Sequence, residues 1–209
     1  MVLCSVGHSF GSIITASMLA KYGEVSDGAI LTGFGFTSQL ANIREAPFGW
    51  GHAGESACRF RERGSGYIVQ QTKGSIQQIH LKKGMFDAEL LEYAEANKET
   101  TTIGQSTPLA GFLGQQPSAL RGPIQVCAEI WELGSSTNAR QFVLGEFDFL
   151  ICNGDCKGTY SPDTLKFLFP VASDARVYLQ PGTGHALTLH KNATAGYQVS
   201  FSYLDSFGL

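Results

Sequence analysis

The first 33 residues carry two apolar runs separated by a segment with helical spacing. Residues 2–6 (VLCSV) predict a strand, and residues 10–22 predict a helix that ends before Gly23. The run GAILTG at 28–33 is apolar on both of its faces, as strands of a parallel sheet are. Strand, helix and strand in this order predict a βαβ unit.

A weaker pattern occupies residues 35–121. Most of this stretch lacks a period, but residues 86–97 (FDAELLEYAEAN) have the spacing of an amphipathic helix. We interpret 35–121 as a helical cap that is inserted into an α/β core. Residues 1–34 are then the part of the core that precedes the cap.

Regular strand and helix patterns resume at residue 122, so we assign 122–209 to the second part of the core. The last helix should bury Tyr197, Phe201 and Leu204, which recur at i, i+4 and i+7. The predicted elements are a strand ending near Gly145, a helix at 163–169, a strand at 176–180 and a helix at 193–207.

Composition narrows the class of protein. Of the 209 residues, 43% are hydrophobic and 16% are charged, against about 25% charged in an average soluble protein, and the net charge is -3. Disorder and a basic nucleic-acid-binding surface are therefore not expected. No apolar run approaches the roughly 18 residues that a bilayer-spanning helix needs, so no transmembrane segment is expected.

The N-terminus and the five cysteines bear on the compartment. Met1 is followed directly by an apolar strand, without the basic region or cleavage site of a signal peptide. There is no Cys-x-x-Cys pair, so neither a disulfide framework nor a zinc site is expected. Cys152 and Cys156 could bridge in an oxidising compartment, but we expect buried free thiols. A cytoplasmic location is favoured, with a secreted parent protein as the alternative.

The sequence GHSFG at residues 7–11 lies between the first strand and the first helix and matches the nucleophile elbow G-x-S-x-G. The serine of such an elbow sits in a strained turn, which needs glycines on both sides and exposes the hydroxyl. Ser9 is therefore the candidate nucleophile. The Phe10 backbone N–H, at the start of a helix, is the expected oxyanion donor. His8 is expected to line the pocket and contact the substrate.

A serine nucleophile needs a histidine base, and the base needs an orienting carboxylate. Of the five histidines only His185, in the loop GTGH, follows a late strand, so it is the candidate base. Asp148, in the turn GEFD, is the candidate acid. Asp155 in NGD is the rival, although Asn-Gly-Asp also favours a plain turn. Structural, solvated or capping roles are expected for the other late or cap histidines, His52, His80 and His190.

The motifs GHSFG, GEFD and GTGH make the chain resemble the α/β-hydrolase superfamily at residues 1–34 and about 142–209. LTGFG, GMFDAELLEYAE and GEFDFLICNGDC are further similar to a group of uncharacterised fungal α/β hydrolases. The resemblance implies a mostly parallel sheet flanked by helices, a helical cap, and a triad of Ser9, Asp148 and His185 that cleaves small-molecule ester or other acyl substrates. It implies no cofactor or metal, and it fixes neither the substrate nor the oligomeric state.

The chain departs from this family at its start. The family core has strands before the elbow strand, and a loop after one of them gives the oxyanion hole its second N–H. Here the elbow strand begins at residue 2, so we interpret the chain as the C-terminal half of an α/β-hydrolase fold. We expect an exposed apolar sheet edge at this strand. The alternative to an active hydrolase is therefore a non-catalytic fragment or pseudoenzyme.

A second departure is the segment 126–141, which interrupts what would otherwise be one strand. Without it, GPIQ would run directly into FVLGEFD and the acid turn. Its first two residues can be encoded as GTATGT, and its last six by a stretch that holds TACTAAT and ends in CAG, which resemble fungal intron signals. We hypothesise that 126–141 is a retained intron. A genuine surface insertion is the alternative.

Other motifs and the cap aromatics add little about the ligand. There is no G-x-G-x-x-G, P-loop or H-E-x-x-H motif. Aromatic residues of the cap favour an apolar acyl or alcohol group in the substrate, although plain packing would also explain them. These residues are Phe34, Phe36, Phe48, Trp50 and Phe60.

Overall fold

The computed structural model describes residues 2–35, 48–106, 124–125 and 143–209. Its largest sheet has the strand order β1-β2-β6-β8, and all neighbouring strands run parallel. A second parallel pair is formed by β7 and β9. The strands are β1 Cys4–His8, β2 Gly28–Thr32, β6 Ile124–Gln125, β7 Val143–Gly145, β8 Ala175–Arg176 and β9 Tyr178–Gln180.

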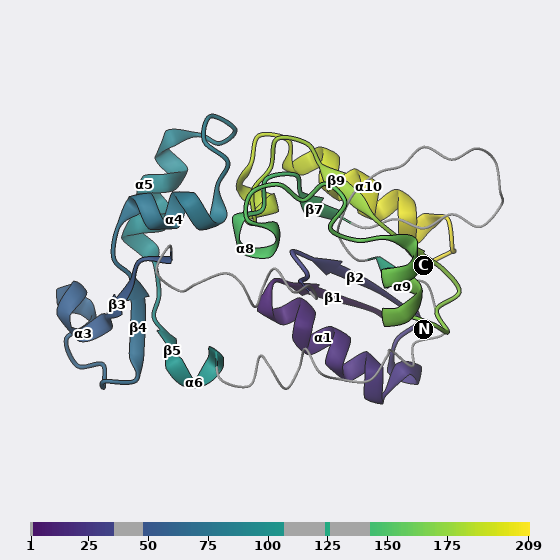
Figure 1. Cartoon of the computed structure of the whole chain (residues 1–209), viewed down its shortest axis with the longest axis horizontal. Helices are drawn as coiled ribbons and strands as arrows, with labels where there is room; N and C mark the ends of the chain where they lie inside the picture. Colours follow the sequence, from purple (N-terminus) through teal and green to yellow (C-terminus); the bar gives the residue numbers. More distant parts are fainter. Residues whose placement is uncertain (1, 36–47, 107–123, 126–142) are drawn as a thin grey trace.

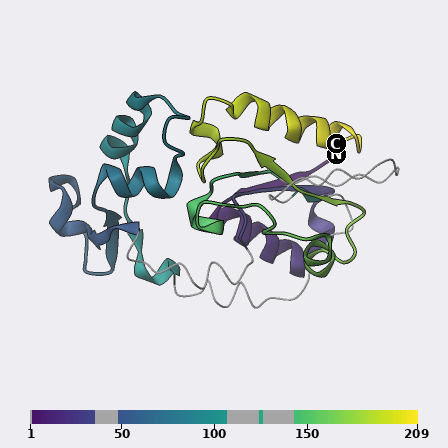
Figure 2. The same ribbon diagram turned by 45° about the horizontal axis from the view of Figure 1, so that its top comes forward.

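Helices lie on both faces of the parallel sheet (Figures 1 and 2). Helix α1, Phe10–Lys21, follows β1 and packs against β1 and β2, and the long helix α10, Ala193–Asp205, lies over the other face. The close approach of α1 depends on Gly7, where a Cβ would lie only 2.6 Å from the backbone oxygen of Gly11. The remaining helices here are short: η1 Gly23–Val25, α8 Phe149–Cys152, α9 Pro162–Leu168 and η4 Leu187–Leu189.

The predicted βαβ unit is present as β1, α1 and β2, with β1 starting two residues later than expected. The predicted apolar face of the last helix is wrong, since Tyr197 and Phe201 are 50% and 63% exposed. Helix α10 instead turns Gly196 and Tyr203 inward. A Cβ at Gly196 would overlap the side chain of Gln180, so contact with β9 decides which face of the helix is buried.

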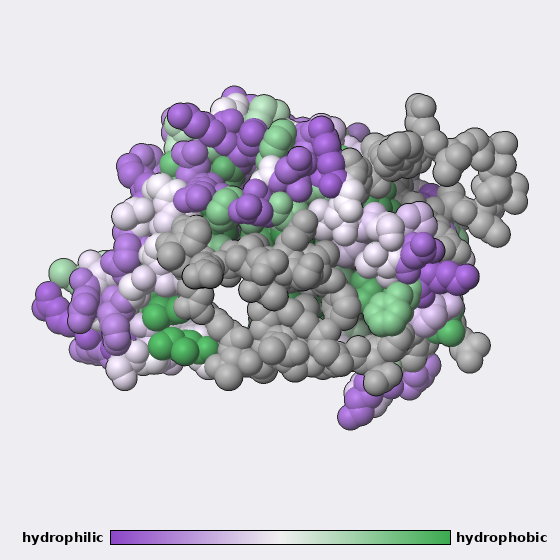
Figure 3. Space-filling view, in the orientation of Figure 1, coloured by the Kyte–Doolittle hydropathy of each residue, from purple (hydrophilic) through white to green (hydrophobic). Residues whose placement is uncertain are grey.

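Residues 48–106 form a second body beside the parallel sheet, at the left of Figure 1. The sequence predicted helices there, and the structure adds an antiparallel sheet of order β3-β4-β5 with a small core of Ala53, Phe60 and Val69. Its outer surface over α4 and α5 is largely hydrophilic (Figure 3). The elements are β3 Trp50–His52, α3 Ala53–Ser56, η3 Cys58–Phe60, β4 Tyr67–Gln70, α4 Lys73–His80, α5 Ala88–Asn97, β5 Thr101–Thr102 and α6 Ile103–Ser106.

Strand β1 is the terminal strand of the four-stranded sheet, and its side chains include exposed apolar residues. Leu3, just before it, and Val6 within it are 49% and 67% exposed. The expected apolar edge is therefore present within the described part of the chain. In those same residues no helix has the length and apolar character needed to cross a membrane.

The strands on either side of the segment 126–141 keep one common register. Ile124 of β6 pairs with Ala175, which lies 51 positions further along the chain, whereas Val143 of β7 pairs with Tyr178, 35 positions further along. The difference of 16 equals the length of 126–141, which itself lies outside the described residues. Removal of that segment would therefore join β6 and β7 into one strand along β8 and β9, without a register shift.

Deletion of residues 126–141 should stabilise the protein. Removing 16 residues between the paired strands β6 and β7 should raise the free energy of unfolding by about 2 kcal/mol, because a longer connection between paired segments costs more conformational entropy to close. Urea denaturation measures the change, and a variant with a Gly/Ser segment of equal length is the control that should match the wild type. A destabilised deletion variant would contradict the interpretation that β6 and β7 would join into one strand.

The retained-intron hypothesis has its own test, because a spliced transcript that still contains these codons would refute it.

Candidate active site

Ser9 occupies the turn between β1 and α1, with φ 54° and ψ −122°. Positive φ is strained for a residue that has a Cβ, as expected for the elbow. The Ser9 N–H donates to the carbonyl of Thr32 at 2.8 Å, which ties the turn to the end of β2. The expectation that both elbow glycines are needed is wrong at Gly11, where a Cβ would meet no atom within 4 Å.

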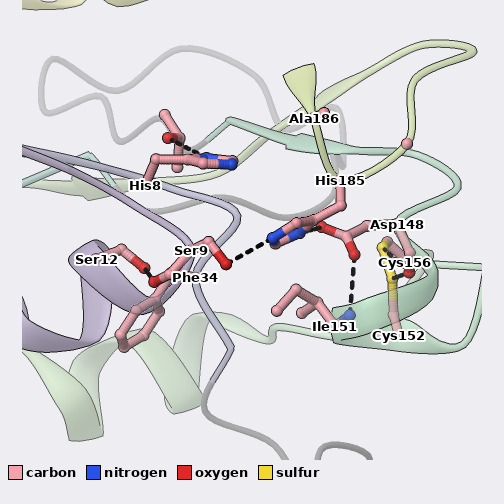
Figure 4. A network of polar contacts seen from close by, with 12 residues as sticks. His8, Ser9, Ser12, Phe34, Asp148, Ile151, Cys152, Cys156, His185 and Ala186 are labelled. Carbon is pink, nitrogen blue, oxygen red and sulfur yellow. Dashed lines mark hydrogen bonds and ion pairs between the residues drawn. A yellow bond between two sulfur atoms is a disulfide. The ribbon is translucent and has the colours of Figure 1, made fainter. Parts of the chain in front are cut away.

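Two hydrogen bonds link Ser9, His185 and Asp148 in one chain (Figure 4). His185 Nε2 lies 2.7 Å from Ser9 Oγ, and His185 Nδ1 lies 2.7 Å from Asp148 Oδ2. Both the histidine and the aspartate are buried, at 2% and 0% exposure. The other Asp148 oxygen accepts the Ile151 N–H at 2.9 Å. The carboxylate is therefore held at both oxygens, and one of them is directed at the imidazole.

The acid turn and the histidine loop are bonded directly to each other. The Phe147 N–H donates to Thr183 O at 2.8 Å, and the Glu146 N–H donates to Gln180 O at 3.1 Å. A Cβ at Gly145 would overlap the backbone oxygen of Thr183, so the two segments could not come this close with another residue there. The backbone itself thus sets the separation of Asp148 and His185.

Asp155, the rival acid, is not part of this network. It is exposed, and its Oδ1 accepts the Lys157 N–H at 3.2 Å, the local contact of a turn.

The expectation that Cys152 and Cys156 are free thiols is wrong, because the structure joins them in a disulfide. Asn153 and Gly154 between them have φ of 56° and 89°, which turns the chain back on itself after α8. The two Cα atoms are therefore 5.0 Å apart, within the usual range for a disulfide. This closed turn directly follows the helix that Asp148 caps.

His8 is exposed and lies beside this network, with its ring centroid 5.0 Å from that of His185 (Figure 4). The Thr32 hydroxyl donates to Gly7 O at 3.2 Å, so it accepts from His8 Nδ1 at 2.9 Å. The proton of His8 is thus on Nδ1, and Nε2 is left as an acceptor. Desolvation, reinforced by the neighbouring His185, lowers the pKa of His8 to about 4.

His80, at the end of α4, is brought to the same place from the body of residues 48–106. Its ring centroid is 5.9 Å from that of His185, and its Nε2 lies 3.2 Å from Gln70 Oε1. Burial is the main cause that lowers the pKa of His80 to about 4, and the nearby His185 lowers it further. Sequence reasoning found a structural histidine here but not its place beside His185, because nothing in the local pattern points to a contact between residues so far apart. His52, by contrast, is exposed on β3.

Acid should destabilise the protein through His80. The unfolded chain binds a proton at this residue near pH 6.5 and the folded protein only near pH 4, so the unfolded state gains protons first as the pH falls. We expect His80 to account for about 3 kcal/mol of lost stability between these values. Urea denaturation at pH 7, 5.5 and 4.5 should show a shallower pH dependence for His80→Gln but not for the control His52→Gln. Equal slopes for both would contradict this.

Phe10 is the first residue of α1 and directly follows Ser9, so its backbone N–H lies at the positive end of the helix dipole. The five aromatic residues expected to favour an apolar substrate group mostly serve packing. Phe34 and Phe60 are buried in separate cores, Phe48 is 9% exposed, Trp50 is 38% exposed, and Phe36 lies outside the described residues. In the ranges that the structure describes, no cluster of His, Cys, Asp or Glu side chains has an arrangement suited to a metal ion.

Solved structures with a similar fold include a methylketone synthase and two esterases. Tomato methylketone synthase I has a TM-score of 0.55 at 8% identity, over 98% of this chain and 71% of its own. A methylesterase from Arabidopsis has a TM-score of 0.53 at 11% identity, over 98% and 70%. A putative aryl esterase from Burkholderia cenocepacia has a TM-score of 0.55 at 14% identity, over 99% and 65%.

Sequence comparison adds no family assignment, because no protein-family model and no curated protein matches the chain. The matches to these structures cover nearly all of this chain, but only 71% and 70% of the first two neighbours' own chains. The protein therefore has a partial α/β-hydrolase fold.

Proposed function

We propose that the protein is a serine hydrolase that cleaves a carboxylic ester or a related acyl substrate. The observation that carries the proposal is the unbroken hydrogen-bond chain from Ser9 through His185 to Asp148. The esterases among the structural neighbours support an ester as the substrate. The cap that we propose for residues 35–121 would cover this site and select among substrates.

In the proposed reaction Ser9 Oγ attacks the ester carbonyl carbon while His185 Nε2 takes its proton. Asp148 holds the proton on Nδ1 and stabilises the imidazolium that forms. The tetrahedral oxyanion would be bound by the Phe10 N–H. Collapse of the intermediate breaks the ester C–O bond, and the departing alcohol takes the proton from His185. Water then cleaves the acyl-enzyme by the same steps.

His8 is the residue that we propose to contact the substrate. His8 is exposed, and its ring centroid lies 5.0 Å from that of His185. Its Nε2 is left as an acceptor, which suits a hydrogen bond from a substrate hydroxyl or N–H group. Because the pKa of His8 lies near 4, the ring stays neutral at neutral pH and adds no positive charge beside His185.

Hydrolysis of p-nitrophenyl esters tests the proposal. The protein should turn over acetate and butyrate esters, and it should release a burst of up to one equivalent of p-nitrophenol per chain with those esters whose acyl-enzyme is hydrolysed more slowly than it forms. The alternative, a non-catalytic chain with an incomplete oxyanion hole, predicts neither burst nor turnover. A folded protein that hydrolyses none of these esters would favour that alternative.

A further inference from the structure

His190 joins two segments that lie far apart in the sequence. It follows η4, and its Nε2 accepts the backbone N–H groups of Lys82 at 2.9 Å and Gly184 at 3.1 Å. Its Nδ1 lies 2.9 Å from Ala186 O. At 4% exposure the side chain is buried. One imidazole therefore bonds both to the cap segment after α4 and to the loop that carries His185.

These partners specify one protonation state of the ring. Two N–H donors at Nε2 require a lone pair there, and a carbonyl at Nδ1 requires a proton. Burial lowers the pKa of His190, which favours this neutral tautomer. The expectation that His190 is solvated is therefore wrong, because its side chain is buried, whereas the residue does stand at the C-terminal cap of η4.

The backbone of residues 184–186 is packed closely against that of residues 80–82. The Ala186 N–H donates to His80 O at 2.9 Å. A Cβ at Gly184 would lie 2.9 Å from His80 O and 3.0 Å from Lys82 N, so only glycine allows this approach without a shift. Gly184 and Ala186 are the immediate neighbours of His185. A shift of residues 80–82 against residues 184–186, which we call the joint, would therefore move His185.

We propose that His190 is a positioning residue, which locks residues 80–82 of the cap to residues 184–186 so that His185 stays in line with Ser9 and Asp148. Its consequence for reactivity rests on the proposed function. The joint itself is a property of the fold and is measurable without any catalysis.

Hydrogen exchange at the two donor amides tests the joint. In the wild type, the Lys82 and Gly184 amides should be protected. In His190→Leu, which removes the acceptor, both should exchange at least about tenfold faster. His190→Gln places an amide oxygen near the position of Nε2 and should keep exchange within about threefold of the wild type. His52→Leu, a change at an exposed cap histidine, should alter neither amide.

Reactivity of Ser9 toward a fluorophosphonate tests the consequence. Labelling by His190→Leu should be slower by about tenfold, with rescue by His190→Gln, and kcat should fall more than KM changes. Altered exchange with no labelling even of the wild type would contradict the proposed function but support the joint. If His190→Leu does not fold, the test rests on two other results: protection of the Lys82 and Gly184 amides in the wild type, and exchange within about threefold of the wild type in His190→Gln. Unprotected amides in the wild type, or a folded Leu variant with unchanged exchange and labelling, would overturn the proposal.

Discussion

Replacement of Ser9 by alanine should reduce ester hydrolysis by about 10⁶-fold in kcat, because the variant has no oxygen that can attack the carbonyl carbon. Ser9 Oγ is the atom that lies 2.7 Å from His185 Nε2. The bond from the turn to the end of β2 is made by the Ser9 backbone N–H and does not involve Oγ. The fold should survive the change, so circular dichroism and the urea midpoint should match the wild type.

The matched control for Ser9→Ala is Ser65→Ala, which removes the same hydroxyl from an exposed position in the body of residues 48–106. Its kcat and KM should equal those of the wild type. Residual activity of Ser9→Ala above about a hundredth of the wild type would mean that another group is the nucleophile.

Replacement of Asp148 by asparagine should lower kcat by about 10⁴-fold, because an amide that donates toward Nδ1 holds the imidazole in the wrong tautomer. Asp148 is fully buried, with one oxygen on His185 and one on the Ile151 N–H. The test compares kcat for Asp148→Asn and Asp155→Asn, two isosteric changes only seven residues apart.

Asp155→Asn should leave kcat within about twofold of the wild type, because Asp155 is exposed and bonds only within its own turn. An equal loss in both variants would point to damage of the turn rather than to a role of the acid. A larger loss in Asp155→Asn would assign the acid to the rival residue.

The elements that bear local signals were predictable from the sequence. The glycine-flanked serine between an apolar strand and a helix places Ser9, and the structure puts His185 and Asp148 within hydrogen-bond distance of one another. Ser9 follows β1 of the four-stranded parallel sheet, and Asp148 and His185 follow β7 and β9 of the parallel pair. The carboxyl ends of parallel strands are where sites of this kind form. The juxtaposition therefore follows from topology once the strands are recognised.

Features set by contacts between distant segments could not be predicted. Tyr197 and Phe201 have helical spacing, yet they are exposed because the fit of Gly196 against β9 turns the helix. His190 bonds to Lys82 across 108 positions, and no local pattern encodes that distance. The disulfide depends on the positive φ of Asn153, which the sequence NGD suggested only as a turn.

The proposed function requires Ser9 to be an activated nucleophile. Incubation of the purified chain with a fluorophosphonate, followed by peptide mass spectrometry, tests this requirement, because the reagent reacts much faster with an activated serine than with an ordinary one. We expect one adduct per chain, on Ser9, that is lost in Ser9→Ala and strongly slowed in Asp148→Asn. No adduct on well-folded protein, or an adduct on another serine, would contradict it.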